Sequence, residues 1–283
     1  MDFAPQGKDH VHHLEAAHRD ALQIDCRKIA RWVRLSPMTS TRVAQRTLRV
    51  CYQLIIIFLF FSLTCLYSAI SCIAGFIDAT GNLAHRCFVQ WARVSLAAAG
   101  LRIHITGLER LDSNTPYIFM PNHASFLDIL LLLAYLPHNF RFIIKKGFFA
   151  VPLVGWALYQ CGNIAMDRNN PWKALRSLRR SADLLNDGIS IVVFPEGTRS
   201  PNGKIQEFKT ALFILPIRSR TPVVPVLIEG SFDALKRGSI LLNPFPLKMT
   251  FYDPIPPSWF EVRDRETYAE KVRRALSAER TPN

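Results

Sequence analysis

The stretch that decides the fold is Tyr117-Ile-Phe-Met-Pro-Asn-His-Ala-Ser-Phe-Leu-Asp-Ile-Leu130, which continues through further leucines to Pro137. Residues 117–120 are apolar and rich in aromatic and branched side chains, so they predict a buried strand. The leucine-rich residues 129–136 predict a buried helix that ends before Pro137, because proline cannot continue a helix. A strand followed at once by a buried helix is a unit of α/β folds.

The junction between this strand and helix carries two titratable side chains. Ser125 and Asp128 have the spacing of a capping box, which predicts a helix start at Ser125 and leaves His123 in the preceding loop. Asp128 can reach back to one ring nitrogen of His123 and so fix the tautomer and steady the imidazolium of a general base. A cap and an ordinary loop histidine would also explain the pair, so its meaning depends on the rest of the chain.

The chain from about residue 102 alternates between short apolar strands and helices. A helix is expected from the Asn170-Pro171 cap to Gly188, and another over 265–279. Further strands are expected at 142–145, 163–166, 189–194, 222–228 and 247–252. This alternation predicts an α/β fold with a central, mostly parallel or mixed sheet flanked by helices.

Polar side chains follow several of these strands, where open α/β sheets bind ligands. Gly197 lets the backbone approach a ligand closely, and the planar guanidinium of Arg199 suits a phosphate. Glu196 and Thr198 are expected to point into the same cleft. The candidate ligand-binding residues are Arg168, Glu196, Gly197, Thr198, Arg199 and Lys209. Each alone would be an ordinary surface turn; several strand ends together indicate a site.

The N-terminal part of the chain is predicted to attach it to a membrane. Residues 1–50 form a basic polar arm, residues 51–100 an apolar helical segment, and residues 101–283 the α/β domain. The apolar run 54–77 is long enough to cross a bilayer, which takes about 20 residues. Basic residues flank it on both sides, so a single span and a hairpin turning near Gly81 both remain open. We favour the hairpin, because it keeps both flanks of the apolar run, and with them the α/β domain, on the cytoplasmic side.

The composition of the chain limits the classes of binding partner that it can have. A net charge of +13 favours anionic partners such as phospholipid head groups or phosphorylated substrates. The sequence has no zinc-finger spacing, aromatic ribonucleoprotein motif or basic region with heptads, so we expect no nucleic-acid partner. The six cysteines include no C-x-x-C pair, which predicts neither a metal site nor a disulfide framework and indicates a reducing compartment.

Four blocks of the sequence carry a resemblance to a known family. Asn122-His-Ala-Ser-Phe-Leu-Asp128 resembles the N-H-x4-D motif of the glycerolipid acyltransferases. Residues 146–168 resemble their second block, Phe194-Pro-Glu-Gly-Thr-Arg199 the third, and Val224-Pro-Val226 the fourth. The blocks occur in the family's order over about residues 100–255. Within these enzymes the chain is most similar to the 1-acylglycerol-3-phosphate (lysophosphatidic acid) acyltransferases.

This resemblance implies a reaction at a membrane of phospholipid. A fatty acyl group would move from acyl-CoA or acyl carrier protein to the sn-2 hydroxyl of lysophosphatidic acid, giving phosphatidic acid for phospholipid biosynthesis. The transfer would be direct, with no acyl-enzyme, metal or resident cofactor. His123 would be the base and Asp128 would orient it. Arg168, Arg199 and Lys209 would hold the phosphate, and Glu196 and Gly197 would shape the glycerol site.

Other functions remain open from the sequence. Within the same class, the acceptor could be another lysolipid, such as a lyso-ornithine lipid, or glycerol 3-phosphate. A lysophospholipase would need a nucleophile, for which Ser125 is the candidate, although no G-x-S-x-G elbow is present. A membrane adaptor with an idle site would bind lipid without depending on His123 or Asp128.

Overall fold

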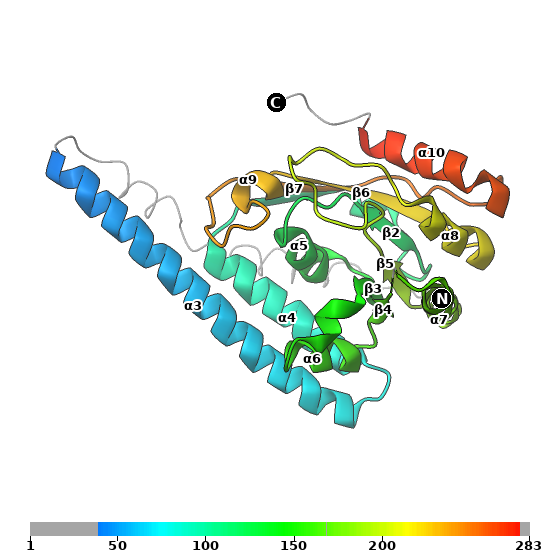
Figure 1. Cartoon of the computed structure of the whole chain (residues 1–283), viewed down its shortest axis with the longest axis horizontal. Helices are drawn as coiled ribbons and strands as arrows, with labels where there is room; N and C mark the ends of the chain where they lie inside the picture. Colours follow the sequence, from blue (N-terminus) through cyan, green and yellow to red (C-terminus); the bar gives the residue numbers. More distant parts are fainter. Residues whose placement is uncertain (1–38, 168, 278–283) are drawn as a thin grey trace, which may run out of the picture.

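The computed structural model describes residues 39–167 and 169–277, and the basic arm lies mostly outside this part of the chain. Two long helices come first, α3 (Thr39–Ile77) and α4 (Asn82–Ala99), which lie side by side and run in opposite directions (Figure 1). The chain reverses between them at Gly81, whose φ of 75° is a left-handed conformation that glycine adopts readily. Because α3 starts at Thr39, the helical segment begins well before residue 51, the boundary predicted from the sequence.

The remaining helices and strands form an α/β domain, whose strands alternate with helices along the chain. The helices are α5 (Leu127–Tyr135), α6 (Val154–Gln160), α7 (Pro171–Asn186), α8 (Ile214–Ser219), α9 (Ser231–Ala234) and α10 (Arg265–Ser277). Short 3₁₀ turns occur at Leu108–Arg110, Lys146–Ala150, Thr210–Phe213 and Val262–Asp264. The strands are β1 (Ile103–Thr106), β2 (Ile118–Pro121), β3 (Phe140–Lys145), β4 (Ile164–Met166), β5 (Ser190–Val192), β6 (Val223–Glu229) and β7 (Leu247–Phe251).

All seven strands belong to one sheet with the order β1-β7-β6-β2-β5-β3-β4. Every neighbouring pair is parallel except β6 and β7, which are antiparallel. This arrangement confirms the predicted α/β class with a mostly parallel sheet. Strand β2 lies at the centre, between β6 and β5, so the loop that follows it is surrounded by the ends of its neighbours.

Both faces of the sheet are covered by helices, as parallel sheets require. Neighbouring residues of β2 point to opposite sides: Phe119 joins a core with α4 and α5, and Ile118 joins a core with α7 and α10. Both side chains are completely buried. The near-continuous apolar run that predicted this strand therefore reflects two hydrophobic cores rather than one.

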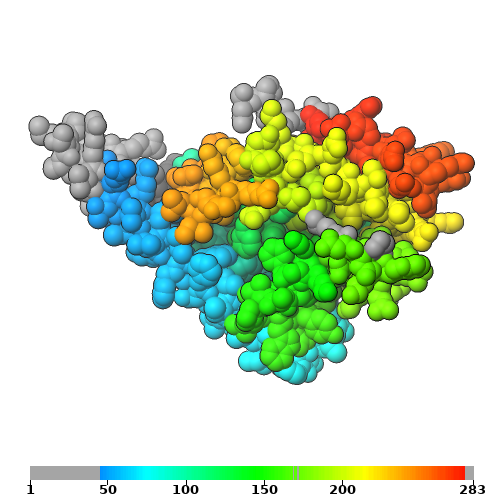
Figure 2. All heavy atoms as spheres, viewed as in Figure 1, coloured from blue at the N-terminus to red at the C-terminus, as the bar shows by residue number. Residues whose placement is uncertain are grey.

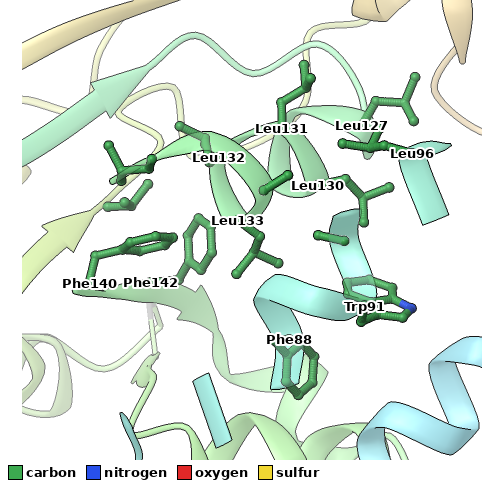
Figure 3. Packing of buried hydrophobic residues seen from close by; sticks show 14 of the residues in the cluster. Phe88, Trp91, Leu96, Leu127, Leu130, Leu131, Leu132, Leu133, Phe140 and Phe142 are labelled. Atoms are coloured by element: carbon green, nitrogen blue, oxygen red, sulfur yellow. The ribbon is translucent and has the colours of Figure 1, made fainter. Parts of the chain in front are cut away.

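Helix α5 is apolar on all sides because it is enclosed. Its leucines pack against Phe88 and Trp91 of α4 on one side and against Phe140 and Phe142 of β3 on the other (Figure 3). Near its C-terminal end, Arg93 Nε of α4 donates a hydrogen bond to Ala134 O at 3.1 Å. A helix held in this way gives a fixed base to the loop that precedes it.

Two sequence predictions about local structure have different outcomes. The predicted cap of α7 is confirmed, because the Asn170 side chain accepts a hydrogen bond from Lys173 N at 3.0 Å. Helix α5 begins at Leu127, two residues later than predicted, but the predicted capping bonds at Ser125 are present. Leu127 N donates to Ser125 Oγ at 3.3 Å, and Ser125 N donates to Asp128 Oδ2 at 2.8 Å. The Ser125 hydroxyl also donates to Leu235 O at 2.7 Å, a tertiary contact that local spacing does not reveal.

A buried arginine joins the turn between α3 and α4 to the sheet. Arg141 of β3 is completely buried and donates to Thr80 O at 3.2 Å and to Asn82 Oδ1 at 2.7 Å. Its other terminal nitrogen binds Asn139 Oδ1 and Phe140 O, each at 2.8 Å. Burial lowers the pKa of this guanidinium. Because a buried cation must keep its acceptors, the helical pair is fixed to the α/β domain.

Candidate active site

The candidate site lies where the parallel strands β2, β5, β3 and β4 end. The loop after β2 contains His123, the loop after β5 contains residues 194–200, and Lys146 and Asp167 follow β3 and β4. Because these strands are parallel neighbours, their carboxyl ends meet at one edge of the sheet. The structure thus gathers at one edge the loops that the sequence separates by dozens of residues.

His123 and Asp128 form a hydrogen-bonded pair, with His123 Nδ1 2.9 Å from Asp128 Oδ2. Asp128 is completely buried, and the same oxygen accepts hydrogen bonds from Ala124 N at 2.7 Å and Ser125 N at 2.8 Å. With Nδ1 donating to the carboxylate, a neutral ring presents Nε2 as a proton acceptor. No residue in the described part of the chain bonds to this Nε2. The pair has the geometry of an oriented general base.

The loop after β5 holds His123 from three directions. Glu196 Oε1 accepts a hydrogen bond from His123 N at 2.8 Å, and Ser200 N donates to His123 O at 2.7 Å. The imidazole stacks on Phe194, with ring centroids 3.8 Å apart and an interplanar angle of 19°. Only 13% of the His123 side chain is exposed. Backbone and ring are therefore both fixed, as catalysis by a preorganised group requires.

Glu196 has a different position from the one predicted. The sequence led us to expect a carboxylate in the ligand cleft, but only 2% of Glu196 is exposed. Its two oxygens accept from His123 N and from Gln206 N, the latter at 3.1 Å. Burial raises the pKa of this carboxyl above its ordinary value. Glu196 is a positioning residue, because two distant backbone N–H groups need an acceptor inside the fold.

The rest of the 197–199 turn lies closer to solvent. Gly197 has a φ of 76°, a left-handed conformation that a side chain would strain. Thr198 is exposed, and its hydroxyl donates to Arg199 O at 3.2 Å. Arg199 is half-buried, and its carbonyl also accepts a hydrogen bond from Arg237 Nη1 at 3.0 Å. The turn is thus held through its backbone.

The other basic candidates have two outcomes. Lys209 is exposed, and its backbone N donates to Pro195 O at 2.8 Å, which places it beside the turn that contains Glu196. Arg168 lies outside the described residues. Its neighbour Asp167 forms an ion pair with Lys146, Nζ to Oδ2 3.6 Å, a cation at the sheet edge that the sequence did not single out.

Two site residues were missed or left without a role by sequence reasoning. The buried Asn122 side chain donates to Ile228 O at 2.9 Å and accepts from Ile228 N at 2.7 Å. The amide thus replaces a backbone partner and ties the end of β2 to β6, one residue before His123. Phe194 stacks on the imidazole and in turn on Phe142, whose ring is parallel within 9°. The only signal for either role was its place in a family motif.

A concavity elsewhere in the molecule does not include this pair. A space of about 870 Å³ lies between α8 and the segment before α10, lined by residues such as Arg218, Pro257 and Arg263. It adjoins Pro222, at the amino end of β6, whereas His123 follows the carboxyl end of β2. Since β2 and β6 are parallel, the two features occupy opposite edges of the sheet.

Comparison with known proteins gives a consistent result. A family model described as Acyltransferase matches residues 102–229. The chloroplastic 1-acyl-sn-glycerol-3-phosphate acyltransferase LPAT1 of Arabidopsis thaliana is 37% identical over 174 residues, 61% of this chain and 48% of that protein. A 1-acyl-sn-glycerol-3-phosphate acyltransferase of Cocos nucifera is 31% identical over 205 residues, covering 68% and 67%. The chain spans about half the length of LPAT1 and of a similar Brassica napus protein.

The fold also matches a solved structure. The crystal structure of the 1-acyl-sn-glycerophosphate (LPA) acyltransferase PlsC from Thermotoga maritima superposes with a TM-score of 0.68. The match covers 83% of this chain and 100% of that one, at 23% sequence identity. At that identity the likeness establishes a shared fold.

Proposed function

The chain belongs to the 1-acyl-sn-glycerol-3-phosphate acyltransferase family, and from this premise we propose that it acylates a lysophospholipid. The proposed acceptor is 1-acylglycerol 3-phosphate, whose free sn-2 hydroxyl would become an ester and yield phosphatidic acid. The single observation that carries the proposal is the His123–Asp128 pair, buried on one side and unbonded at Nε2 within the described residues. This pair lies inside the segment that the family model matches.

The proposed chemical step uses His123 as a general base. Nε2 takes the proton of the acceptor hydroxyl while the hydroxyl oxygen attacks the carbonyl carbon of an acyl thioester. The new C–O bond forms, the C–S bond breaks, and the imidazolium returns the proton to the leaving thiolate. Asp128 stays ionised and stabilises the imidazolium through Nδ1. The thioester, acyl-CoA or acyl carrier protein, is a co-substrate, and the step needs no resident cofactor.

The proposed phosphate site consists of basic side chains at the same sheet edge. Arg199 lies in the loop that holds His123, Lys209 N bonds to Pro195 O of that loop, and Arg168 follows β4 in the sequence. A guanidinium offers a planar pair of donors to a phosphate, and an ammonium adds a point charge. Gly197, between them and Glu196, gives the acceptor's glycerol close access to the backbone.

The position of Ser125 argues against a lysophospholipase. That reaction without a thioester donor would need an exposed nucleophile beside the histidine. Ser125 is completely buried, and its hydroxyl donates to Leu235 O rather than to His123. We therefore treat it as a structural residue of the catalytic loop.

The proposed location is the cytoplasmic side of a membrane, with α3 lying along one leaflet. Residues 45–77 of α3 are long and apolar enough to cross a bilayer by length and composition. However, α3 touches the α/β domain at both ends of this run, through Gln53 to Leu242 and through Phe76 to Trp156. These contacts are about 35 Å apart at 1.5 Å per residue. A helix tied to a folded domain over that length favours the hairpin arrangement over a single span.

An acyl-transfer assay with purified full-length protein tests the proposal. Lysophosphatidic acid, a lyso-ornithine lipid and glycerol 3-phosphate are each paired with acyl-CoA and with acyl carrier protein thioester. We expect a thioester-dependent ester product with lysophosphatidic acid at the highest kcat/KM. Release of free fatty acid from the lysolipid without a thioester, or transfer to none of these acceptors, would overturn the proposal.

A further inference from the structure

The segment between α9 and β7, residues 235–246, exposes apolar side chains and is here called the strap. Ile240 and Leu241 are 65% and 56% exposed, and Phe245 is 41% exposed. Between them Leu242 is buried in the core that also contains α4 and α5. Leu235, at the start of the strap, also packs against this core. The strap is therefore anchored at Leu235 and Leu242 and exposes Ile240, Leu241 and Phe245, an arrangement that a globular surface usually avoids unless it has a partner.

A polar side chain of α3 fixes the strap to the apolar helix. Gln53 Nε2 donates to Leu242 O at 2.6 Å, and Gln53 Oε1 accepts from Leu242 N at 3.0 Å. The side-chain amide thus acts like a strand partner for one residue of the strap. In the space-filling view, orange atoms that include the strap adjoin the blue half of α3 (Figure 2). On α3, Leu54 and Phe58 are also exposed, and Leu54 follows the Gln53 that bonds to the strap, so apolar side chains are exposed on both partners of this contact.

The other end of the strap touches the catalytic loop. Ser125, two residues after His123, donates through its hydroxyl to Leu235 O at 2.7 Å. Helix α3 meets the same loop directly, since the rings of Phe60 and Phe126 lie edge to face with centroids 5.8 Å apart. The apolar helix, the strap and the catalytic loop therefore contact one another in a closed triangle.

The charge of the strap complements an anionic surface. Lys236 and Arg237 are exposed next to the apolar tips, and Arg237 also donates to Arg199 O in the loop that holds His123. Basic residues adjoining an apolar surface are the pattern of elements that lie on anionic lipid. An isolated apolar patch would fit a protein partner equally well, but the contact with α3 favours a bilayer.

We propose that the strap is a second membrane-contact element that docks on an anionic phospholipid surface. Its apolar tips enter the head-group boundary beside α3, while Lys236 and Arg237 contact lipid phosphates. Because the strap bonds to Ser125 and to Arg199 O, this docking holds the catalytic loop and the 194–200 loop in their working positions. The inference rests on the proposed membrane location and acyl-transfer function.

Photo-cross-linking tests the docking without relying on activity. A diazirine amino acid replaces Leu241 in one protein and Trp259 in another, and each is reconstituted into vesicles of phosphatidylcholine with phosphatidylglycerol. Trp259 is a matched control because it is 82% exposed on the segment before α10. We expect about tenfold more lipid adduct at position 241, because an interfacial element buries its apolar face among acyl chains. Equal yields at the two positions, or adducts to protein in place of lipid, would overturn the proposal.

A turnover comparison tests the link to the catalytic loop. The double change Ile240→Ser with Leu241→Ser should lower kcat/KM about tenfold for a vesicle-borne acceptor and leave a soluble short-chain acceptor nearly unaffected. Trp259→Ser should change neither. An unchanged rate on vesicles would contradict the coupling. If the unmodified protein transfers no acyl group at all, the proposed function fails while the cross-linking result still decides the docking.

Discussion

His123 and Arg199 belong to neighbouring loops at the same edge of the sheet, but the fold holds them differently. The ring of His123 is bonded to Asp128 and stacked on Phe194, and its backbone is bonded on both sides. For Arg199 only the backbone is held, and no residue in the described ranges bonds its guanidinium. Rigidity is thus concentrated on the group proposed to move a proton, while the groups proposed to bind phosphate can adapt to a ligand.

Removing the charge of the Asp128 carboxylate, which bonds to the His123 ring, should produce the largest loss of activity. Asp128→Asn keeps the size of the side chain but no longer stabilises an imidazolium, so we expect kcat to fall about 100-fold with little change in KM. Steady-state kinetics with lysophosphatidic acid measures both values. Equal kcat in the variant and the unmodified protein would show that the buried carboxylate only shapes the loop.

Disturbing the support of the catalytic loop should have the next largest effect. In Glu196→Gln the side-chain amide can accept from only one of its two partners, His123 N and Gln206 N. One buried N–H then lacks an acceptor, which corresponds to about a tenfold loss in kcat. A rise in KM with kcat unchanged would instead indicate that Glu196 contacts the ligand, as the sequence predicted.

The same carboxyl gives a pH-dependent prediction. Burial raises the pKa of Glu196 in the folded protein, so the folded state holds its proton more tightly than the unfolded state. The contribution of this protonated carboxyl to the free energy of unfolding is complete below the ordinary glutamate pKa. It is lost as the pH rises through the pKa that Glu196 has in the folded protein. Urea unfolding of the unmodified protein and of Glu196→Gln should be measured over this pH range. As the pH rises, the free energy of unfolding of the unmodified protein should fall relative to that of the variant. A difference that moves the other way would contradict the raised pKa.

Removing a cation proposed to bind the acceptor's phosphate should have the smallest effect on activity. Arg199→Ala and Lys209→Ala each remove one exposed or half-buried cation, so we expect KM for lysophosphatidic acid to rise about fivefold while kcat changes little. Lys173→Ala, an exposed cation on α7, is the matched control. If Arg199→Ala lowers kcat as strongly as Asp128→Asn, the proposed contrast between rigid and adaptable halves is wrong.

Local signals in the sequence were sufficient for much of the fold. The apolar run at 117–120, the leucines of α5 and the cap at Asn170 each act on residues a few positions away, so their patterns predicted β2, α5 and α7. The α/β class follows from the alternation of such elements. The reversal near Gly81 was favoured for a different reason, namely that it keeps both flanks of the apolar run on one side of a membrane. In the structure the turn uses the left-handed conformation of Gly81.

Contacts between residues far apart in the chain could not be predicted from local sequence patterns. Glu196 binds a backbone group 73 positions away, and Asn122 binds Ile228 at a separation of 106. Neither spacing has a local signature, so Glu196 was predicted to lie in the cleft. The bond from the Ser125 hydroxyl to Leu235 O, 110 positions away, was missed for the same reason, although its local cap bond was predicted. Strand β1 was likewise not singled out, because its four residues pair with β7 near the other end of the chain.

The central claim is that Nε2 of His123 takes the acceptor's proton, and the rate of His123→Ala tests it most directly. The variant is purified beside His104→Ala, which removes an exposed imidazole from β1, and both are assayed with lysophosphatidic acid after circular dichroism has shown an intact fold. The account predicts that His123→Ala loses activity by about 10² to 10⁴ while His104→Ala remains active. A folded His123→Ala protein that turns over at the unmodified rate would contradict it.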